Sequence, residues 1–153
     1  YCVGGAYCLV QFCDLAVAAE NADFFYPEAQ LGFCGGLIAS TAARIPHKIA
    51  MELMLTGKHF DAKRAYEVGM VNQVVPVGKQ VEAAMNYAKI LANSAPLVVG
   101  MIKRFVRDDV TPKGPSELHA LARAELFTIR NSEDQQEGGA AFREKRTPIF
   151  KGR

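Results

Sequence analysis

The chain has 153 residues, of which 50% are hydrophobic and 22% are charged, a composition typical of one globular domain with a sizeable core. Its formal net charge of +2 is too small to predict binding to nucleic acid, and its apolar runs fall well short of the roughly 20 residues of a membrane-spanning helix. The composition therefore predicts a soluble, cytoplasmic protein that binds neither nucleic acid nor membranes.

The first 28 residues predict a helix followed by two extended segments. Residues 1–3 read like the middle of a strand, so we expect the chain to begin at an internal position of its domain. A helix over residues 5–13 follows the glycine pair Gly4-Gly5, and its nearly continuous apolar character, broken only by Gln11, predicts burial on most faces. Extended segments are predicted over residues 15–19 and 23–26, and the second must stop at Pro27.

The rest of the chain is predicted to be helical with one short strand. Stop and start signals divide the helices: Thr56-Gly57 ends one, Asp61 caps another, and Ser132 with Gln135 forms a capping box. The predicted helices cover residues 37–45, 49–56, 62–68, 81–91, 96–110, 118–129 and 133–146; a strand lies within 71–77, a linker at 112–115, and an irregular basic tail at 147–153.

The cysteines show no spacing typical of a metal site or a disulfide framework. Cys2, Cys8, Cys13 and Cys34 lie among apolar residues, and none forms a Cys-x-x-Cys pair. This pattern predicts buried thiols and no bound metal.

Several blocks of the sequence resemble one known family. They are the residues of 1–9, 13–19, 22–28 and 31–32, the run 50–57 that ends in Thr-Gly, the run 65–76 that contains Gly-Met-Val-Asn, and the run 137–146. Together they resemble the crotonase, or enoyl-CoA hydratase/isomerase, superfamily. The resemblance implies an α/β fold: a crotonase-like ββα spiral over residues 1–78, partial because its N-terminal portion is missing, followed by a C-terminal α-helical oligomerisation region over residues 79–153. Homotrimers or hexamers are expected.

The resemblance also implies a site for an acyl-CoA thioester, which would be a substrate and not a permanently bound cofactor. In similar proteins two backbone amides hold the thioester carbonyl, and one amide belongs to the glycine that matches Gly5. Because Gly4 has no side chain, the backbone can approach a ligand closely there. The matching acid/base is Glu28, and Pro27 directly before it is expected to line the substrate site together with Gly4.

Cys8 occupies the position at which a hydratase of this family carries a second glutamate. A thiol with a pKa of about 8.5, raised further by burial, cannot orient and deprotonate water as a carboxylate does at neutral pH. The residue at this position therefore favours single-acid, isomerase-like chemistry over efficient two-glutamate hydration, with Cys8 as a buried thiol in the substrate site.

The C-terminal end is the predicted contact for coenzyme A. In similar proteins an aromatic residue and a lysine that match Phe142 and Lys145 reach the adenine and the phosphates, and Arg146 lies beside them. A solvated charged helix with one packed phenylalanine explains the same pattern, and Lys58, His59 and Arg64 offer alternative positive charge.

Two classes of function remain open at this stage. The first is an acyl-CoA hydratase or isomerase that stabilises a thioester enolate, with Glu28 as acid/base and Gly5 as half of the oxyanion hole. The second is a truncated or catalytically deficient homologue that acts as a binding or assembly protein.

Overall fold

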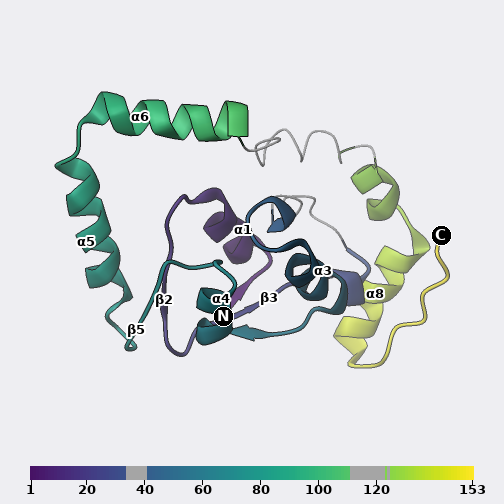
Figure 1. Ribbon diagram of the computed structural model, residues 1–153. Coiled ribbons are helices and arrows are strands. Elements are labelled where there is room, and N and C mark those ends of the chain that lie inside the picture. The colour runs from purple at the N-terminus through teal and green to yellow at the C-terminus, as the bar shows by residue number, and fades with distance from the viewer. Residues whose placement is uncertain (34–40, 111–122, 124) are drawn as a thin grey trace.

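Strand pairings between distant segments hold the first half of the chain together (Figure 1). In this computed structural model, which describes residues 1–33, 41–110, 123 and 125–153, β1 (Cys2–Val3) runs parallel to β3 (Asp23–Phe25), and β4 (Phe60–Asp61) runs antiparallel to β3. A second sheet pairs β2 (Val17–Ala19) in parallel with β5 (Gln73–Val75). Parallel strands need a crossover connection, and α1 (Gly5–Phe12) lies in the connection between β1 and β3.

The remaining helices follow the predicted order, except that α2 (Glu28–Leu31) and the strand β4 were not predicted. They are α2, α3 (His47–Thr56), α4 (Ala62–Glu67), α5 (Gln80–Ala92), α6 (Pro96–Phe105) with the π-helical η2 (Val106–Val110), a helical stretch at 125–130, and α8 (Glu133–Glu144). The tail at 147–153 has no regular secondary structure, as predicted.

Predicted local signals mark the helix ends. Gly57 takes the left-handed conformation with φ 61° and donates to the carbonyl of Leu53 over 3.1 Å, which ends α3. Asp61 accepts the amide of Arg64 at 2.7 Å and so caps α4. Ser132 Oγ accepts the amide of Gln135 at 3.0 Å, but Gln135 Oε1 is buried without a partner among the described residues, so only half of the predicted capping box forms.

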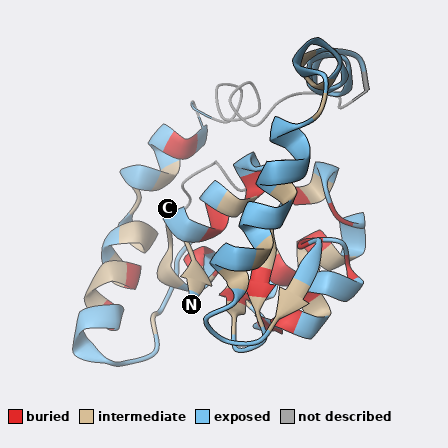
Figure 2. Cartoon of the chain, turned by 90° about the vertical axis from the view of Figure 1, so that its left-hand side faces the viewer, coloured by how far each residue is buried: buried red, intermediate tan, exposed pale blue. Residues whose placement is uncertain are grey.

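The hydrophobic core lies where α1, the strands, α3 and α4 meet, and buried residues gather in the middle of the molecule in Figure 2. The least exposed members are Tyr7, Phe24, Ala50, Leu53, Phe60, Ala62 and Ala65. By contrast, no residue of α5 or of α6 is buried, and both helices lie at the edge of the molecule in Figure 1. The core is thus formed mainly by the first half of the chain.

Three expectations about the helices are wrong. α1 is not buried on most faces: Tyr7, Cys8 and Gln11 are buried, but Leu9 is 68% exposed, because the described elements cover only one stripe of the helix. The helix after Pro96 does not stay α-helical to residue 110, since its last five residues are π-helical. In place of the α-helix expected up to residue 45, residues 41–43 form a short 3₁₀ turn.

Some expectations lie outside the described residues. They concern residues 37–40 of the first predicted run, the linker at 112–115, most of the helix predicted over 118–129, and Cys34. Within the described ranges, none of the helices has the length and apolarity that crossing a bilayer requires.

Candidate functional site

The parallel pairing of β1 with β3 brings two distant segments of the predicted site together. Val3 pairs with Phe25, so the chain after β1, at Gly4-Gly5, and the chain after β3, at Pro27-Glu28, leave the sheet at the same edge. A Cβ placed on Gly4 would lie 3.4 Å from Glu28 Oε1. The glycine pair and the carboxylate are therefore neighbours in space although more than twenty residues separate them.

Gly4 has a backbone conformation that only glycine adopts readily. Its φ of 54° and ψ of −117° place the start of α1 against the Glu28 carboxyl group, and its carbonyl accepts the amide of Cys8 at 3.0 Å. No side chain caps α1, and a Cβ on Gly5 would meet nothing within 4 Å. The first amides of α1, at the positive end of the helix, can therefore receive a carbonyl oxygen that gains negative charge.

Glu28 is the first residue of α2 and is only 8% exposed. Its Oε2 is buried and has no hydrogen-bond partner among the described residues. Burial raises the pKa of Glu28 above its ordinary value, and a hydrogen bond to its own backbone partly offsets this effect. Such a carboxyl group can take up and return a proton near neutral pH more readily than an exposed one.

The other predicted residues of this region belong to α1 and to the start of α2. Pro27 precedes α2 as its N-cap residue and provides no side-chain cap. Cys8 lies one turn into α1 and is 7% exposed, as expected of a buried thiol, whereas the same expectation is wrong for Cys13, which is exposed, and Cys2 is only half-buried. No second carboxylate is present on α1. The described site therefore contains one acid/base group.

The two neighbouring cations at the C-terminus, Lys145 and Arg146, differ in their ion pairs. Arg146 Nη1 and Nη2 donate to the two oxygens of Glu137 over 2.5 and 2.8 Å, and its Nε donates to Glu144 over 2.6 Å. Lys145, at the end of α8, forms no ion pair with any residue in the described part of the chain. Phe142 is 71% exposed and Lys145 is also exposed, whereas the charged atoms of Arg146 are engaged with two carboxylates.

The alternative cations are all engaged with carboxylates. Lys58 pairs with Glu52 at 2.5 Å, Arg64 lies 3.8 Å from Glu67, and His59 Nδ1 lies 2.7 Å from Asp23. His59 also stacks on Phe25, with ring centroids 4.0 Å apart. These residues therefore present less free positive charge than the sequence suggested.

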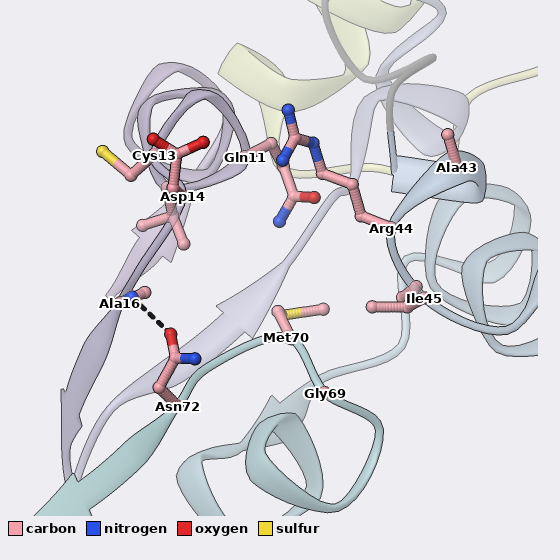
Figure 3. Close-up of a pocket in the computed structure, with 11 residues that line it drawn as sticks. Gln11, Cys13, Asp14, Ala16, Ala43, Arg44, Ile45, Gly69, Met70 and Asn72 are labelled. Carbon is pink, nitrogen blue, oxygen red and sulfur yellow. Dashed lines mark hydrogen bonds between the residues drawn. The ribbon is translucent and has the colours of Figure 1, made fainter. Parts of the chain in front are cut away.

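Sequence reasoning missed a polar cavity of about 270 Å³ at the far end of α1 (Figure 3). Gln11 and Arg44 both line it, and so does Asn72, whose side chain accepts the amide of Ala16 at 2.8 Å. Gln11 is 3% exposed, and its place as the one polar residue in an apolar helix was the available signal. The cavity lies beyond the last turn of α1, whereas Gly5 and Glu28 lie at the first turn.

In the described ranges, no three His, Cys, Asp or Glu side chains come together as a metal site requires. The expectation that the protein works without a metal or a permanently bound cofactor stays a prediction.

Comparison with known proteins adds independent information. The family model described as enoyl-CoA hydratase/isomerase matches residues 1–153. Carnitinyl-CoA dehydratase from Salmonella typhi is 35% identical over 170 residues, covering 100% of this chain and 60% of that protein. Carnitinyl-CoA dehydratase from Citrobacter koseri is 36% identical over 160 residues with the same coverage.

Solved structures agree with these matches. A carnitinyl-CoA hydratase from Mycobacterium avium superposes with a TM-score of 0.89 at 36% identity, covering 99% of this chain and 59% of that one. Methylmalonyl-CoA decarboxylase, solved with 2-nitronate-propionyl-CoA, superposes with a TM-score of 0.80 at 30% identity and the same coverage. The chain thus spans about three fifths of the length of these relatives.

Proposed function

Because the chain belongs to the enoyl-CoA hydratase/isomerase family, which also accounts for its crotonase-like α/β fold, we propose that the protein acts on an acyl-CoA thioester by proton transfer next to the thioester carbonyl. The single observation that carries this proposal is the buried Glu28 carboxyl group, whose Oε2 has no partner among the described residues and whose Oε1 lies against Gly4. A polar atom buried without a partner is costly, and a substrate that uses it explains its presence.

In the proposed mechanism the thioester oxygen accepts the amide of Gly5, as one half of the oxyanion hole. The Glu28 carboxylate removes a proton from the α or γ carbon, and the electron pair moves toward the thioester oxygen to give an enolate. The amides at the start of α1 stabilise this negative charge. Return of the proton from Glu28 to the other carbon shifts the double bond, which is an isomerisation that needs one carboxyl group.

Dehydration of a 3-hydroxyacyl-CoA is the second candidate, and the similarity to two carnitinyl-CoA dehydratases at 35–36% identity favours it. Glu28 would remove the α proton, and the resulting carboxylic acid would protonate the departing hydroxyl group to release water. Because Cys8 does not supply a second carboxyl group, Glu28 would perform both transfers. A non-catalytic homologue is the alternative, and measuring turnover of acyl-CoA distinguishes the two.

Phe142 and Lys145 are the proposed contacts for the adenine and phosphate groups of coenzyme A, because both side chains are exposed and Arg146 is engaged with acids. Cys8, Gly4 and Pro27 would line the part of the site near the thioester.

Comparing Glu28→Gln with the unchanged protein tests the proposed activity. We expect turnover of 3-enoyl-CoA, or of 3-hydroxyacyl-CoA, to fall by about 10²- to 10⁴-fold, because a positioned acid/base contributes that much. Glu20→Gln changes an exposed carboxylate in the same way and should leave turnover unchanged. Equal rates for Glu28→Gln and the unchanged protein would contradict the role of Glu28, and no turnover in the unchanged protein would favour the non-catalytic alternative.

A further inference from the structure

Helix α8 touches α2 backbone to backbone at Gly138. Gly138 is buried, and a Cβ at this position would overlap the carbonyl group of Leu31 and lie 3.1 Å from the amide nitrogen of Gly32. The obstructing atoms belong to the backbone, so a side chain could not be accommodated by a rotamer change. Any residue larger than glycine must push α8 and the end of α2 apart.

A second close contact lies beside the first. A Cβ on Gly32 would overlap the carbonyl oxygen of Asp134, in the first turn of α8, and lie 3.1 Å from Cε1 of Phe150 in the tail. The Asp134 carboxylate in turn accepts the amides of Lys151 and Gly152 at 2.6 and 2.7 Å. The first turn of α8 and the tail therefore enclose the residue that ends α2.

The end of α2 is hydrogen-bonded directly to Glu28. The carbonyl of Glu28 accepts the amides of both Gly32 and Phe33, the latter at 3.0 Å. Helix α2 has only four residues, and Pro27 supplies no side-chain cap at its start. Nothing longer than one helical turn separates the α8 contact from the carboxyl group, so a displacement at Leu31-Gly32 reaches Glu28.

We propose that Gly138 is a positioning residue for the reaction: by allowing α8 to lie directly on Leu31 and Gly32, it sets where the Glu28 carboxyl group stands relative to Gly4. The inference rests on the proposed function in taking Glu28 as the catalytic group. It assigns α8 a role at the site in addition to the oligomerisation expected of the region 79–153.

Two neighbouring glycines of α8 provide a matched test. A Cβ on Gly139 would meet only Nη1 of Arg143 at 3.5 Å, an ordinary contact with a flexible side chain. Gly138→Ala and Gly139→Ala gain the same helix propensity, and they differ in the overlap with α2. We expect kcat to fall about 100-fold in Gly138→Ala, since a displacement of about 1 Å at a reacting group has this effect, with KM nearly unchanged, whereas Gly139→Ala keeps both values.

A measurement without turnover separates this inference from the proposed function. In protein labelled with ¹³C at glutamate carboxyl groups, the Glu28 resonance, assigned by its loss in Glu28→Gln, is followed against pH by NMR. We expect the midpoint of the Glu28 titration to shift in Gly138→Ala and to remain unchanged in Gly139→Ala, even if no acyl-CoA is turned over. Equal titrations and equal kcat in the two alanine variants would overturn the inference while leaving the role of Glu28 intact.

A milder variant keeps the test decisive if Gly138→Ala loses its helical circular dichroism. Asp134→Ala removes the two hydrogen bonds to the tail without creating an overlap, and Glu82→Ala removes an acid from the distant α5 as its control. A shift of the Glu28 titration in Asp134→Ala alone supports the inference, and identical titrations in both variants count against it.

Discussion

At the scale of single residues, burying the Glu28 carboxyl group lowers the stability of the fold but suits the group to the proposed proton transfer. Its carboxyl group is buried at the start of α2, beside a glycine whose backbone no other residue adopts readily. The adjacent cations Lys145 and Arg146 differ in their interactions. Arg146 forms ion pairs with Glu137 and Glu144, whereas Lys145 is exposed. Chemical type alone does not reveal which of two like residues is available.

The stability gained by replacing Glu28 with glutamine should grow as the pH rises. Burial raises the pKa of Glu28 above its ordinary 4.5, so the folded state binds the proton more tightly than the unfolded state. The free energy of unfolding therefore falls as the pH rises from about 4.5 through the raised pKa, by about 1.4 kcal/mol for each pH unit that separates the folded from the unfolded pKa. Urea unfolding of both proteins from pH 4 to 8 checks this, and a difference that does not grow with pH would contradict it.

At the scale of elements, α8 and the tail form one unit held by acidic side chains. Glu137 accepts two hydrogen bonds from the Arg146 guanidinium and one from the amide of Ile149 at 2.9 Å, and Asp134 accepts the amides of Lys151 and Gly152. The bonds to Glu137, above all those from Arg146, lower the pKa of Glu137 to about 2. Because α8 contacts the end of α2, a loss of the bonds between α8 and the tail should affect the candidate site.

The tail should detach from α8 at low pH. The folded pKa of Glu137 is below its ordinary 4.5, so its contribution to stability is present above pH 4.5 and is lost as the pH falls toward about 2. In Glu137→Gln this part of the pH dependence should disappear. Hydrogen exchange at the amide of Ile149 should be faster than in the unchanged protein at pH 6, and equal protection in the two proteins would contradict the role of Glu137.

At the scale of the whole molecule, the least covered elements are α5 and α6. On α6 the side chains of Val98, Met101, Ile102 and Phe105 are spaced as one helical face, and each is 51–55% exposed. An apolar face of this kind on a protein surface usually contacts another chain. A contact between subunits through this face is therefore expected, and the homotrimer or hexamer stays a prediction.

The double substitution Met101→Glu with Ile102→Glu should lower the oligomeric state measured by sedimentation equilibrium, because it places charge inside the proposed contact. Arg104→Glu changes a residue outside this apolar face and should keep the assembly, as a control. If the unchanged protein sediments as a monomer, the prediction of an oligomer is wrong; if the double variant keeps the assembly, the contact lies on another surface.

The sequence by itself determined the family, the fold class and most helix ends. Caps such as Asp61 and stops such as Gly57 depend on residues within one or two turns of one another, so local chemistry is sufficient to predict them. The short elements α2 and β4 were not predicted. The two halves of the candidate site were also named in advance, because the resemblance identified Gly5 and Glu28 as a pair.

Only the tertiary structure decided which parts of these elements are covered and what touches what. The apolar pattern of α1 suggested burial all round, yet the stripe with Tyr7, Cys8 and Gln11 alone faces the core. The engagement of Arg146, the half-formed capping box and the contact of Gly138 with Leu31 likewise depend on partners distant in sequence or on the packing of whole elements. Burial and backbone contact are properties of the packed chain, so no local pattern encodes them.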